Sequence, residues 1–374
     1  MEHTKRIYFL DTLRTFVITL VVFYHVNMHY VNLFQDMPFV KNMVPDAFSS
    51  IILFLILAVN GQLMNAIMFF IAGYFALGPL IKKGATPFLK DKIVRLGIPY
   101  LVGLILLSPI ASYIAARSWG NDEGFFKYWI FEFYKSQNIS QFHLWFIGVL
   151  LLFFILLSLV YVICSVRVKS AGITKGQLTF RSIVLFIAVT TGFYFVVNQF
   201  INEASFTNLY IINFQGVMLL VYAAYFLLGI HAYQKDWFKT GYRPRIIPWF
   251  VTYVISIIIY IAFVVYESTV PDIANFSVVN LLLVLSFNIS IFSAVFVLLA
   301  LFQRFADKST PFTKRISISR YSIYIFHYVV VYALIYATNH ISLPVFAEYG
   351  LVLALSILLS WGLGYLMSNV RYYK

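Results

Sequence analysis

Apolar residues along this chain gather in stretches that are each long enough to cross a lipid bilayer as a helix. Such a span needs about 20 mostly apolar residues. The pattern predicts an all-α fold, a polytopic membrane bundle of about ten transmembrane helices that forms a single domain over residues 1–374. The predicted spans are residues 7–29, 61–81, 96–116, 142–165, 182–201, 213–233, 246–266, 277–302, 321–340 and 349–368.

One apolar stretch does not fit a simple span. From Ala47 to Ile81 the chain is nearly continuously apolar, which is too long for one perpendicular span and too short for two. We therefore interpret residues 47–60 as an interfacial or re-entrant helix that breaks near Asn60 and Gly61, before the second span. In the following segment, "KKGATPFLKDKIVRLGIPY", Pro87 is expected to open a short basic helix that runs into the third span.

Composition supports a membrane protein, and the distribution of charge predicts its orientation. Hydrophobic residues make up 61% of the chain and charged residues only 11%, too few to cover a soluble surface of this size. If the N-terminus is cytoplasmic, 22 of the 27 Lys and Arg residues lie in inner segments and four in outer ones. This bias predicts cytoplasmic N- and C-termini in a multi-pass protein of the cell membrane, most simply a bacterial plasma membrane. The net charge of +13 is thereby explained without nucleic acid as a partner, and membrane lipids surround the bundle.

Metal and disulfide chemistry find little support in the sequence. Cys164 is the only cysteine, which excludes an intramolecular disulfide and a cysteine-based metal cage. His29 follows His25 by four residues, the spacing of a two-histidine metal site, but no acidic or cysteine ligand lies nearby. We expect no metal and no permanently bound cofactor.

The first predicted span, "LDTLRTFVITLVVFYHV", carries three titratable side chains. Such groups are costly at membrane depth, so a functional role facing the bundle interior is the default hypothesis. Arg14 and His25 are eleven residues apart, close to three turns, and project from one helix face about 16 Å apart. Asp11 precedes Arg14 by one turn, which places both near the cytoplasmic surface and His25 in the outer half. The alternatives are an ion pair between Asp11 and Arg14 at the helix start and a structural histidine at His25.

Two further histidines lie within predicted spans. His143, in "QFHLWFIGVLLL", opens the fourth span from the outside, so we expect it at a depth similar to that of His25. His327, in "RYSIYIFHYVV", lies two turns into the ninth span from the cytoplasm, so we expect it nearer to Arg14 than to His25. A purely structural role is the alternative for His327.

Taken in order, these elements resemble acyltransferase family 3. "RIYFLDTLRTFVITLVVFYHV" is similar to the family's opening helix with its Arg and His, and "MFFIAGYFA" to its second span, with Ala72 in place of Ser. "FLKDKIVRLGIPY" resembles its Arg-x-x-Arg-x-x-x-Pro element, although Lys92 replaces the first Arg and loses the bidentate fork of a guanidinium. "FHLWFIGVLL", "YFLLGI" and "YSIYIFH" also fit, so that the resemblance covers essentially the whole ten-span domain.

The resemblance implies transfer of an acyl group, acetyl or succinyl, from cytoplasmic acyl-CoA to a hydroxyl of a glycan, lipid-linked sugar or similar acceptor on the outer side. Acetyl-CoA or succinyl-CoA would then be a co-substrate. His25 is implied as the catalytic residue, and His143 is expected to orient His25, to stabilise the oxyanion or to bind the acceptor. The residues expected to bind the donor are Asp11, Arg14, Lys92, Arg95 and His327.

The chemistry of acyl transfer matches this arrangement. Transfer from a thioester to an alcohol needs a base for the hydroxyl proton, a docked donor and stabilisation of the oxyanion. A neutral imidazole at His25 suits the first task, and the distance from Arg14 to His25 is comparable to an extended pantetheine arm. Two other classes stay open, namely a transporter or flippase of a lipid-linked sugar and a non-catalytic membrane sensor or assembly protein.

Overall fold

Ten helices in the described part of the chain are long and apolar enough to cross a membrane, which confirms the predicted fold class. The computed structural model describes residues 7–31, 46–134, 140–170, 174–201, 206–209, 212–239, 241–270, 277–308, 310–339 and 341–368. Both chain ends, whose cytoplasmic location we expect, fall outside these ranges. The spans are built from α1 (Tyr8–Tyr30), α2 (Ala47–Tyr74), α4 to α6 (Ala85–Lys92, Ile98–Val102, Ser108–Ser118), α8 (Trp145–Ser170), α9 (Phe180–Asn198), α10 (Gly216–Gln234), α11 (Ile246–Thr269), α12 (Val278–Phe305), α13 (Pro311–Thr338) and α14 (Val345–Ser368).

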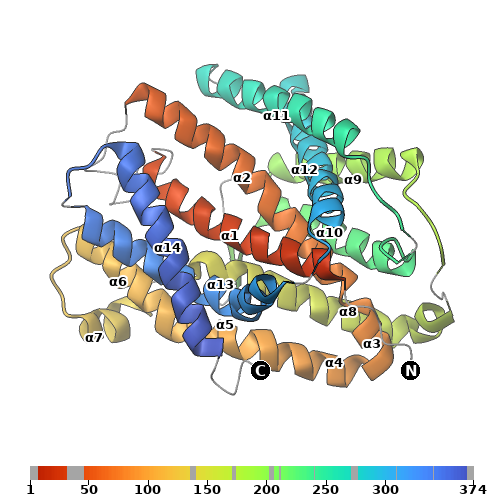
Figure 1. Cartoon of the computed structure of the whole chain (residues 1–374), viewed down its shortest axis with the longest axis horizontal. Coiled ribbons are helices and arrows are strands. Elements are labelled where there is room, and N and C mark those ends of the chain that lie inside the picture. The colour runs from red at the N-terminus through yellow and green to blue at the C-terminus, as the bar shows by residue number, and fades with distance from the viewer. Residues whose placement is uncertain are drawn as a thin grey trace.

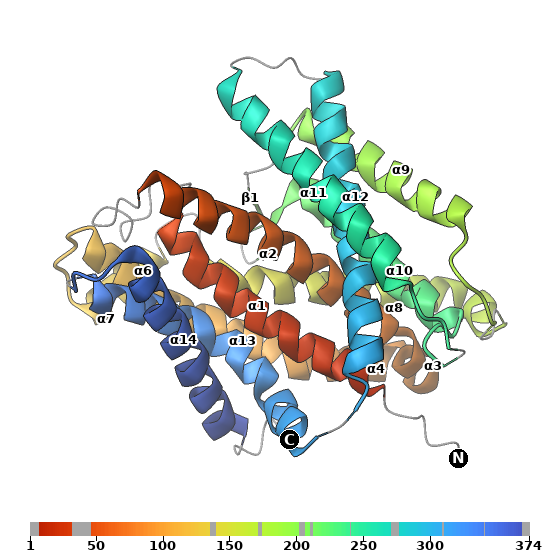
Figure 2. The same cartoon turned by 45° about the horizontal axis from the view of Figure 1, so that its top comes forward.

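Helix α1 lies inside the bundle, in contact with α2, α12, α13 and α14 (Figures 1 and 2). Its buried residues include Leu10, Leu13, Val17 and Val26, none of which exposes any surface. The three ionisable residues Asp11, Arg14 and His25 of this helix are each partly buried among protein neighbours, as the cost of ionisable groups in a bilayer requires.

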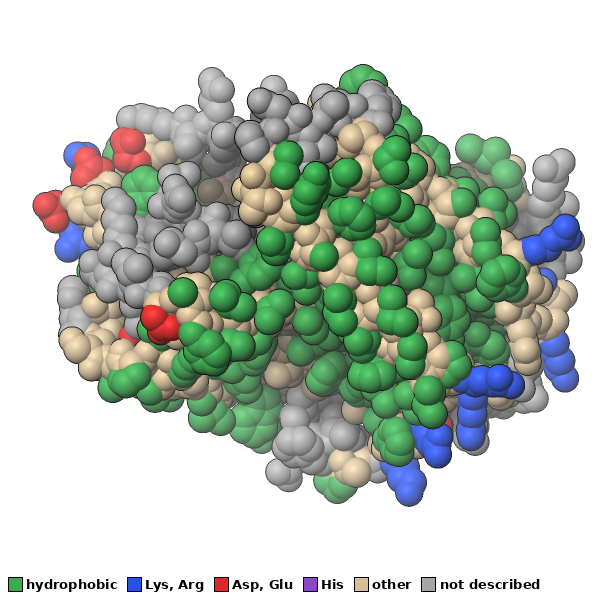
Figure 3. All heavy atoms as spheres, turned by 90° about the horizontal axis from the view of Figure 1, so that it is seen from above, with side chains coloured by type: hydrophobic (Ala, Val, Ile, Leu, Met, Phe, Trp, Pro, Cys, Tyr) green, Lys and Arg blue, Asp and Glu red, His purple; other side chains and the backbone are tan. Residues whose placement is uncertain are grey.

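Charged side chains lie at the ends of the molecule rather than around its middle. Figure 3 shows hydrophobic side chains over the centre of one face, with Lys and Arg gathered at one end and acidic side chains toward the other. An apolar belt between two polar ends is the surface that a bilayer solvates. We name the end with Lys82, Lys83, Lys90 and Lys92 the basic end.

The expected break near Asn60 and Gly61 is wrong, because α2 runs without interruption from Ala47 to Tyr74. The Asn60 amide, which suggested the break, instead donates a hydrogen bond to the Leu20 carbonyl of α1 at 2.9 Å. Gly61 packs against the ring of Tyr24, where a Cβ would come within 3.3 Å. Both polar and small residues thus serve packing between the helices. A short helix, α3 (Leu77–Lys83), follows α2.

Residues 85–118 form one helical rod that contains two wider π-helical turns, at Ile93–Gly97 and Gly103–Leu107. The short helix expected from Pro87 onward does run into the third span. Proline lacks the N–H that an α-helix needs, so Pro109 cannot bond to the carbonyl of Ile105. That carbonyl accepts instead from the Trp129 indole at 3.1 Å and the Tyr134 hydroxyl at 3.3 Å. The aromatic segment of α7 (Phe125–Lys127) and the following turn Tyr128–Phe133 is thereby fastened to the rod.

The sequence pattern did not predict the short antiparallel hairpin of β1 (Phe206–Leu209) and β2 (Ile212–Gln215). We expected the sixth span to begin at residue 213, whereas α10 begins at Gly216. The backbone N–H of Asn213 donates to Oε1 of Gln141 at 3.0 Å. This bond joins the hairpin to the segment that precedes α8.

Two glycines allow α2 and α10 to cross at backbone contact. A Cβ on Gly73 would lie 1.9 Å from the Phe226 carbonyl oxygen, and one on Gly229 would lie 2.0 Å from that of Phe70. Real Cβ atoms do not approach so closely, so any larger residue must push the helices apart.

We expect Gly73→Ala to lower the free energy of unfolding by about 1–3 kcal/mol, the usual cost of overpacking. Thermal unfolding of the purified protein in detergent measures this. Gly362→Ala in α14 is the matched control, because no described atom lies within 4 Å of a Cβ there. Equal melting temperatures for the two variants would contradict the close crossing.

Candidate active site

Three histidines from distant parts of the sequence meet inside the bundle. His25 belongs to α1, His327 to α13, and His143 to the 3-10 turn Phe142–Leu144 that leads into α8. The ring centroids of His25 and His327 lie 5.0 Å apart, those of His143 and His327 4.6 Å, and those of His25 and His143 6.4 Å. His327 is fully buried and His143 is 4% exposed, whereas His25 is only partly buried. His25 is thus the accessible member of the cluster.

Backbone carbonyls determine which ring nitrogen of each neutral imidazole carries the proton. A carbonyl oxygen only accepts hydrogen bonds, so the nitrogen beside it must donate. Nδ1 of His25 lies 2.7 Å from the Val21 carbonyl, and Nδ1 of His327 lies 2.7 Å from the Tyr324 carbonyl. Nε2 of His143 lies 3.1 Å from the Ile325 carbonyl. His25 and His327 are therefore Nδ1–H tautomers, and His143 is the Nε2–H tautomer.

These tautomers leave lone pairs at defined positions. Nε2 of His25 holds a lone pair and has no hydrogen-bond partner among the described residues. Nδ1 of His143 also holds a lone pair and is a buried atom without a partner within the described ranges. Nε2 of His327 lies 3.2 Å from Nδ1 of His25 and accepts a hydrogen bond from it.

Aromatic side chains of α13 and of the turn before α8 enclose the histidines. The Tyr328 ring stacks on His143, with centroids 5.1 Å apart and planes at 20°, and meets the edge of His25 at 5.0 Å. Phe142 packs against Tyr328, with centroids 4.9 Å apart, and the Tyr324 hydroxyl donates to the His143 carbonyl. Our sequence analysis missed these tyrosines, although Tyr328 directly follows His327 and Tyr324 precedes it by nearly one turn.

Three charged residues gather toward the other end of α1. The Asp11 carboxylate forms an ion pair with Arg320 of α13 at 3.0 Å, so it is bound to a second helix. The Arg14 guanidinium lies 4.6 Å above the Phe75 ring, close enough to Asp11 and Arg320 to interact with both charges. Within the described residues it makes no direct hydrogen bond, which leaves its N–H groups available to a ligand.

Of the two basic residues expected beside Arg14, Lys92 lies nearer to the bundle interior. Its ammonium group lies 4.6 Å from the Phe154 ring and 5.2 Å from the Phe88 ring, within electrostatic reach of Arg14. The Arg95 side chain is 74% exposed and pairs with Asp91 at 2.9 Å. The structure therefore groups Lys92 with Arg14 and places Arg95 at the periphery.

The expected position of His327 near Arg14 is wrong, because His327 hydrogen-bonds to His25. We counted its depth from Arg320, as if the helix began at the predicted span. Helix α13 begins at Pro311, so His327 lies more than four turns from the helix start. Arg320 is the residue of α13 that pairs with Asp11, whereas the sequence pattern assigned it to the inner segment before the ninth span. The spacing of seven residues between Arg320 and His327 places both on one face and was the available signal.

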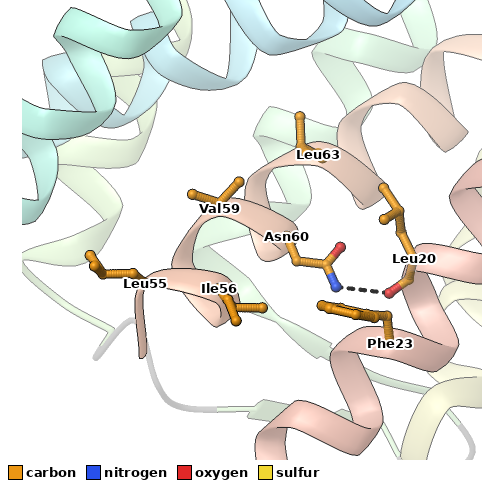
Figure 4. Close-up of a pocket in the computed structure, with 7 residues that line it drawn as sticks. All are labelled: Leu20, Phe23, Leu55, Ile56, Val59, Asn60 and Leu63. Carbon is orange, nitrogen blue, oxygen red and sulfur yellow. Dashed lines mark hydrogen bonds between the residues drawn. The ribbon is translucent and has the colours of Figure 1, made fainter. Parts of the chain in front are cut away.

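An apolar pocket of about 320 Å³ lies between α1 and α2, apart from the histidines. Figure 4 shows its lining residues, with the Asn60 amide bound to the Leu20 carbonyl. None of these side chains is titratable, so the pocket offers no acid–base chemistry. Among the described residues, no three His, Cys, Asp or Glu side chains are arranged to hold a metal ion.

In the described part of the chain, a bundle of ten apolar helices with a histidine cluster inside it defines a multi-pass membrane protein with a candidate acid–base site. Residues 7–365 match the family model of the acyltransferase domain. The chain therefore belongs to acyltransferase family 3, and it is a membrane acyltransferase. No curated protein and no solved structure matches it.

Proposed function

We propose that the protein transfers an acetyl or succinyl group from cytoplasmic acyl-CoA to a hydroxyl of a glycan, lipid-linked sugar or similar acceptor on the outer side of the plasma membrane. His25 is the general base. The observation that carries this proposal is the free Nε2 of His25, a partly buried residue on the helix that also carries Arg14 about 16 Å away. A base and a cation on one face of one helix suit a donor that enters from the basic end.

The nucleotide phosphates of acyl-CoA bind at the basic end in this proposal. Arg14 supplies guanidinium N–H donors, which suit phosphate oxygens, and Lys92 adds a second positive charge nearby. Asp11 and Arg320 form an ion pair that joins α1 to α13 beside this site. The pantetheine arm then runs along α1 toward His25.

The transfer step needs one proton acceptor that later returns the proton. Nε2 of His25 takes the hydroxyl proton while the hydroxyl oxygen attacks the thioester carbonyl carbon. The tetrahedral intermediate collapses by breaking the carbon–sulfur bond, and the departing thiolate takes the proton back from His25. The products are the acyl ester and CoA with its free thiol. No covalent acyl-enzyme is required.

His143 binds a substrate hydroxyl or amide N–H in this proposal. Its own ring N–H is held by the Ile325 carbonyl, so the neutral ring has only an acceptor, Nδ1, to offer. An acceptor cannot stabilise an oxyanion, which argues against one of the roles considered for this residue. A buried lone pair without a partner gains most from a ligand that donates to it.

A thioester assay tests the proposed function. Purified protein is incubated with acetyl-CoA or succinyl-CoA, and release of the CoA thiol is followed with a thiol reagent. We expect slow hydrolysis in the absence of the acceptor, because water can replace the hydroxyl. A transporter or a non-catalytic sensor would release no thiol above the rate of boiled protein, and that result with both donors would contradict the proposal.

Substitution of Lys92 and of Arg95 should have graded effects on donor binding. We expect Lys92→Ala to raise the KM for acyl-CoA about 5- to 20-fold, and Arg95→Ala to raise it less than about threefold. The reason is that Arg95 is solvent-exposed and already paired, whereas Lys92 is within reach of Arg14. Michaelis constants from the thioester assay give the comparison. A larger rise in KM for Arg95→Ala than for Lys92→Ala would contradict the assignment of Lys92 as the stronger donor-binding residue.

A further inference from the structure

We infer that His327 is a positioning residue that holds His25 in the tautomer required of a base. This inference rests on the proposed function and deepens it, because it assigns His327 to the proton-transfer site and not to the donor site. The imidazole of His327 determines which ring nitrogen of His25 carries the proton and which one is free.

Both ring nitrogens of His327 are already engaged within the protein. Nδ1–H donates to the Tyr324 carbonyl at 2.7 Å, and Nε2 accepts from His25 at 3.2 Å. The side chain has no exposed surface, and its ring lies against that of His143 at 4.6 Å. No nitrogen of His327 remains for acyl-CoA, and its orientation is fixed by packing and by the helix backbone.

The hydrogen bond to His327 favours one tautomer of His25. Nδ1 of His25 faces two acceptors, the Val21 carbonyl at 2.7 Å and the lone pair of His327 Nε2 at 3.2 Å. If the proton moved to Nε2 of His25, three lone pairs would face one another without a proton between them. The proton therefore stays on Nδ1, and Nε2 remains free to accept one from a substrate.

The same pair of acceptors assists the step in which His25 becomes charged. When Nε2 takes the hydroxyl proton, the positive charge spreads over the ring and strengthens the hydrogen bonds donated by Nδ1. In hydrolytic triads an aspartate orients and stabilises the catalytic histidine in this way. Here a neutral histidine, itself oriented by a backbone carbonyl, does so.

The kinetic test compares His327→Leu with His327→Gln, whose side-chain amide carries an acceptor oxygen near the place of Nε2. We expect His327→Leu to lower kcat for thioester hydrolysis about 10- to 100-fold, with the KM for acetyl-CoA changed less than about twofold. His327→Gln should recover at least about a third of the wild-type kcat. A rise in KM with unchanged kcat would overturn the inference in favour of a donor-binding role, and equal losses in both variants would overturn it in favour of packing alone.

A spectroscopic test does not depend on turnover. In protein labelled with nitrogen-15 at histidine, the ring signals of His25 are assigned from the spectrum of His25→Ala. We expect an unprotonated Nε2 and a protonated Nδ1 in the wild type, and a mixture of tautomers in His327→Leu. A protonated Nε2 in the wild type would overturn the inference. If the wild type showed this tautomer but released no thiol from any acyl-CoA, the proposed function would fail while the positioning role stood.

Discussion

His25→Ala is expected to lower kcat for acyl transfer and for thioester hydrolysis by about 10²- to 10⁴-fold, the usual contribution of a general base. The KM for acyl-CoA should stay within about threefold of the wild type, because the proposed phosphate site at Arg14 is some 16 Å away along the helix. The reason lies in the free Nε2 of His25, which has no replacement in the variant: the lone pair of His143 is buried and that of His327 is already engaged. Initial rates at saturating acyl-CoA measure the loss.

His231→Ala is a suitable control for this prediction. His231 lies in the last turn of α10, with its ring 6.1 Å from that of Trp237 and away from the cluster. It should retain wild-type kcat and a similar melting temperature. Wild-type turnover in a folded His25→Ala protein would show that another group removes the proton.

The second large effect is expected at Arg14. Replacing Arg14 by Ala would remove the charge-assisted hydrogen bonds that we propose it donates to phosphate, each worth about 1.5–3 kcal/mol, so the KM for acyl-CoA should rise about 10- to 100-fold. The KM of Arg14→Lys should lie between those of the wild type and Arg14→Ala, because lysine keeps the positive charge but lacks the planar fork of the guanidinium. kcat at saturating donor should change little. The same thioester assay, run over a range of acyl-CoA concentrations, measures both constants.

Arg117→Ala is a suitable control, since Arg117 pairs with Asp122 at 3.3 Å beyond the last turn of α6, far along the rod from Lys92. Its KM should equal that of the wild type. An unchanged KM for acyl-CoA in Arg14→Ala would contradict donor binding at the basic end, even if His25→Ala lost activity as expected.

The sequence pattern was sufficient to predict the spans and the similar depth of His25 and His143. Runs of apolar residues determine the helices, because lipid solvates them wherever they lie in the chain. The placement of Arg14 and His25 on one face depends only on helical geometry. The depth of His143 depends only on where its helix starts. These predictions use one helix at a time, which explains their success.

Features that depend on how two helices pack could not be predicted from the sequence, or were predicted at the wrong position. The depth of His327 requires the true start of α13, which lies in a polar segment before the apolar run. The partner of Asp11 is Arg320, more than 300 positions away, and only the packing of α1 against α13 brings them together. The partner of the Asn60 amide likewise lies on another helix, at the Leu20 carbonyl of α1.

The partners of individual backbone groups also lie beyond sequence reasoning. The span predicted over residues 96–116 runs through Pro109, as the structure shows, but its sequence does not indicate that Trp129 and Tyr134 bind the Ile105 carbonyl that the proline leaves open. The tautomers of the three histidines depend on carbonyl positions at about 3 Å, which no spacing rule provides.

The most direct test of the central claim is acyl transfer across the membrane itself. Inverted membrane vesicles from cells that produce the protein are supplied with radiolabelled acetyl-CoA or succinyl-CoA on their outer, cytoplasmic face. The account predicts alkali-labile label on glycans or lipid-linked sugars inside the vesicles, protected from added esterase until detergent is present, and its loss in vesicles with His25→Ala. Ester label of equal amount in wild-type and His25→Ala vesicles, or none with either donor, would contradict it.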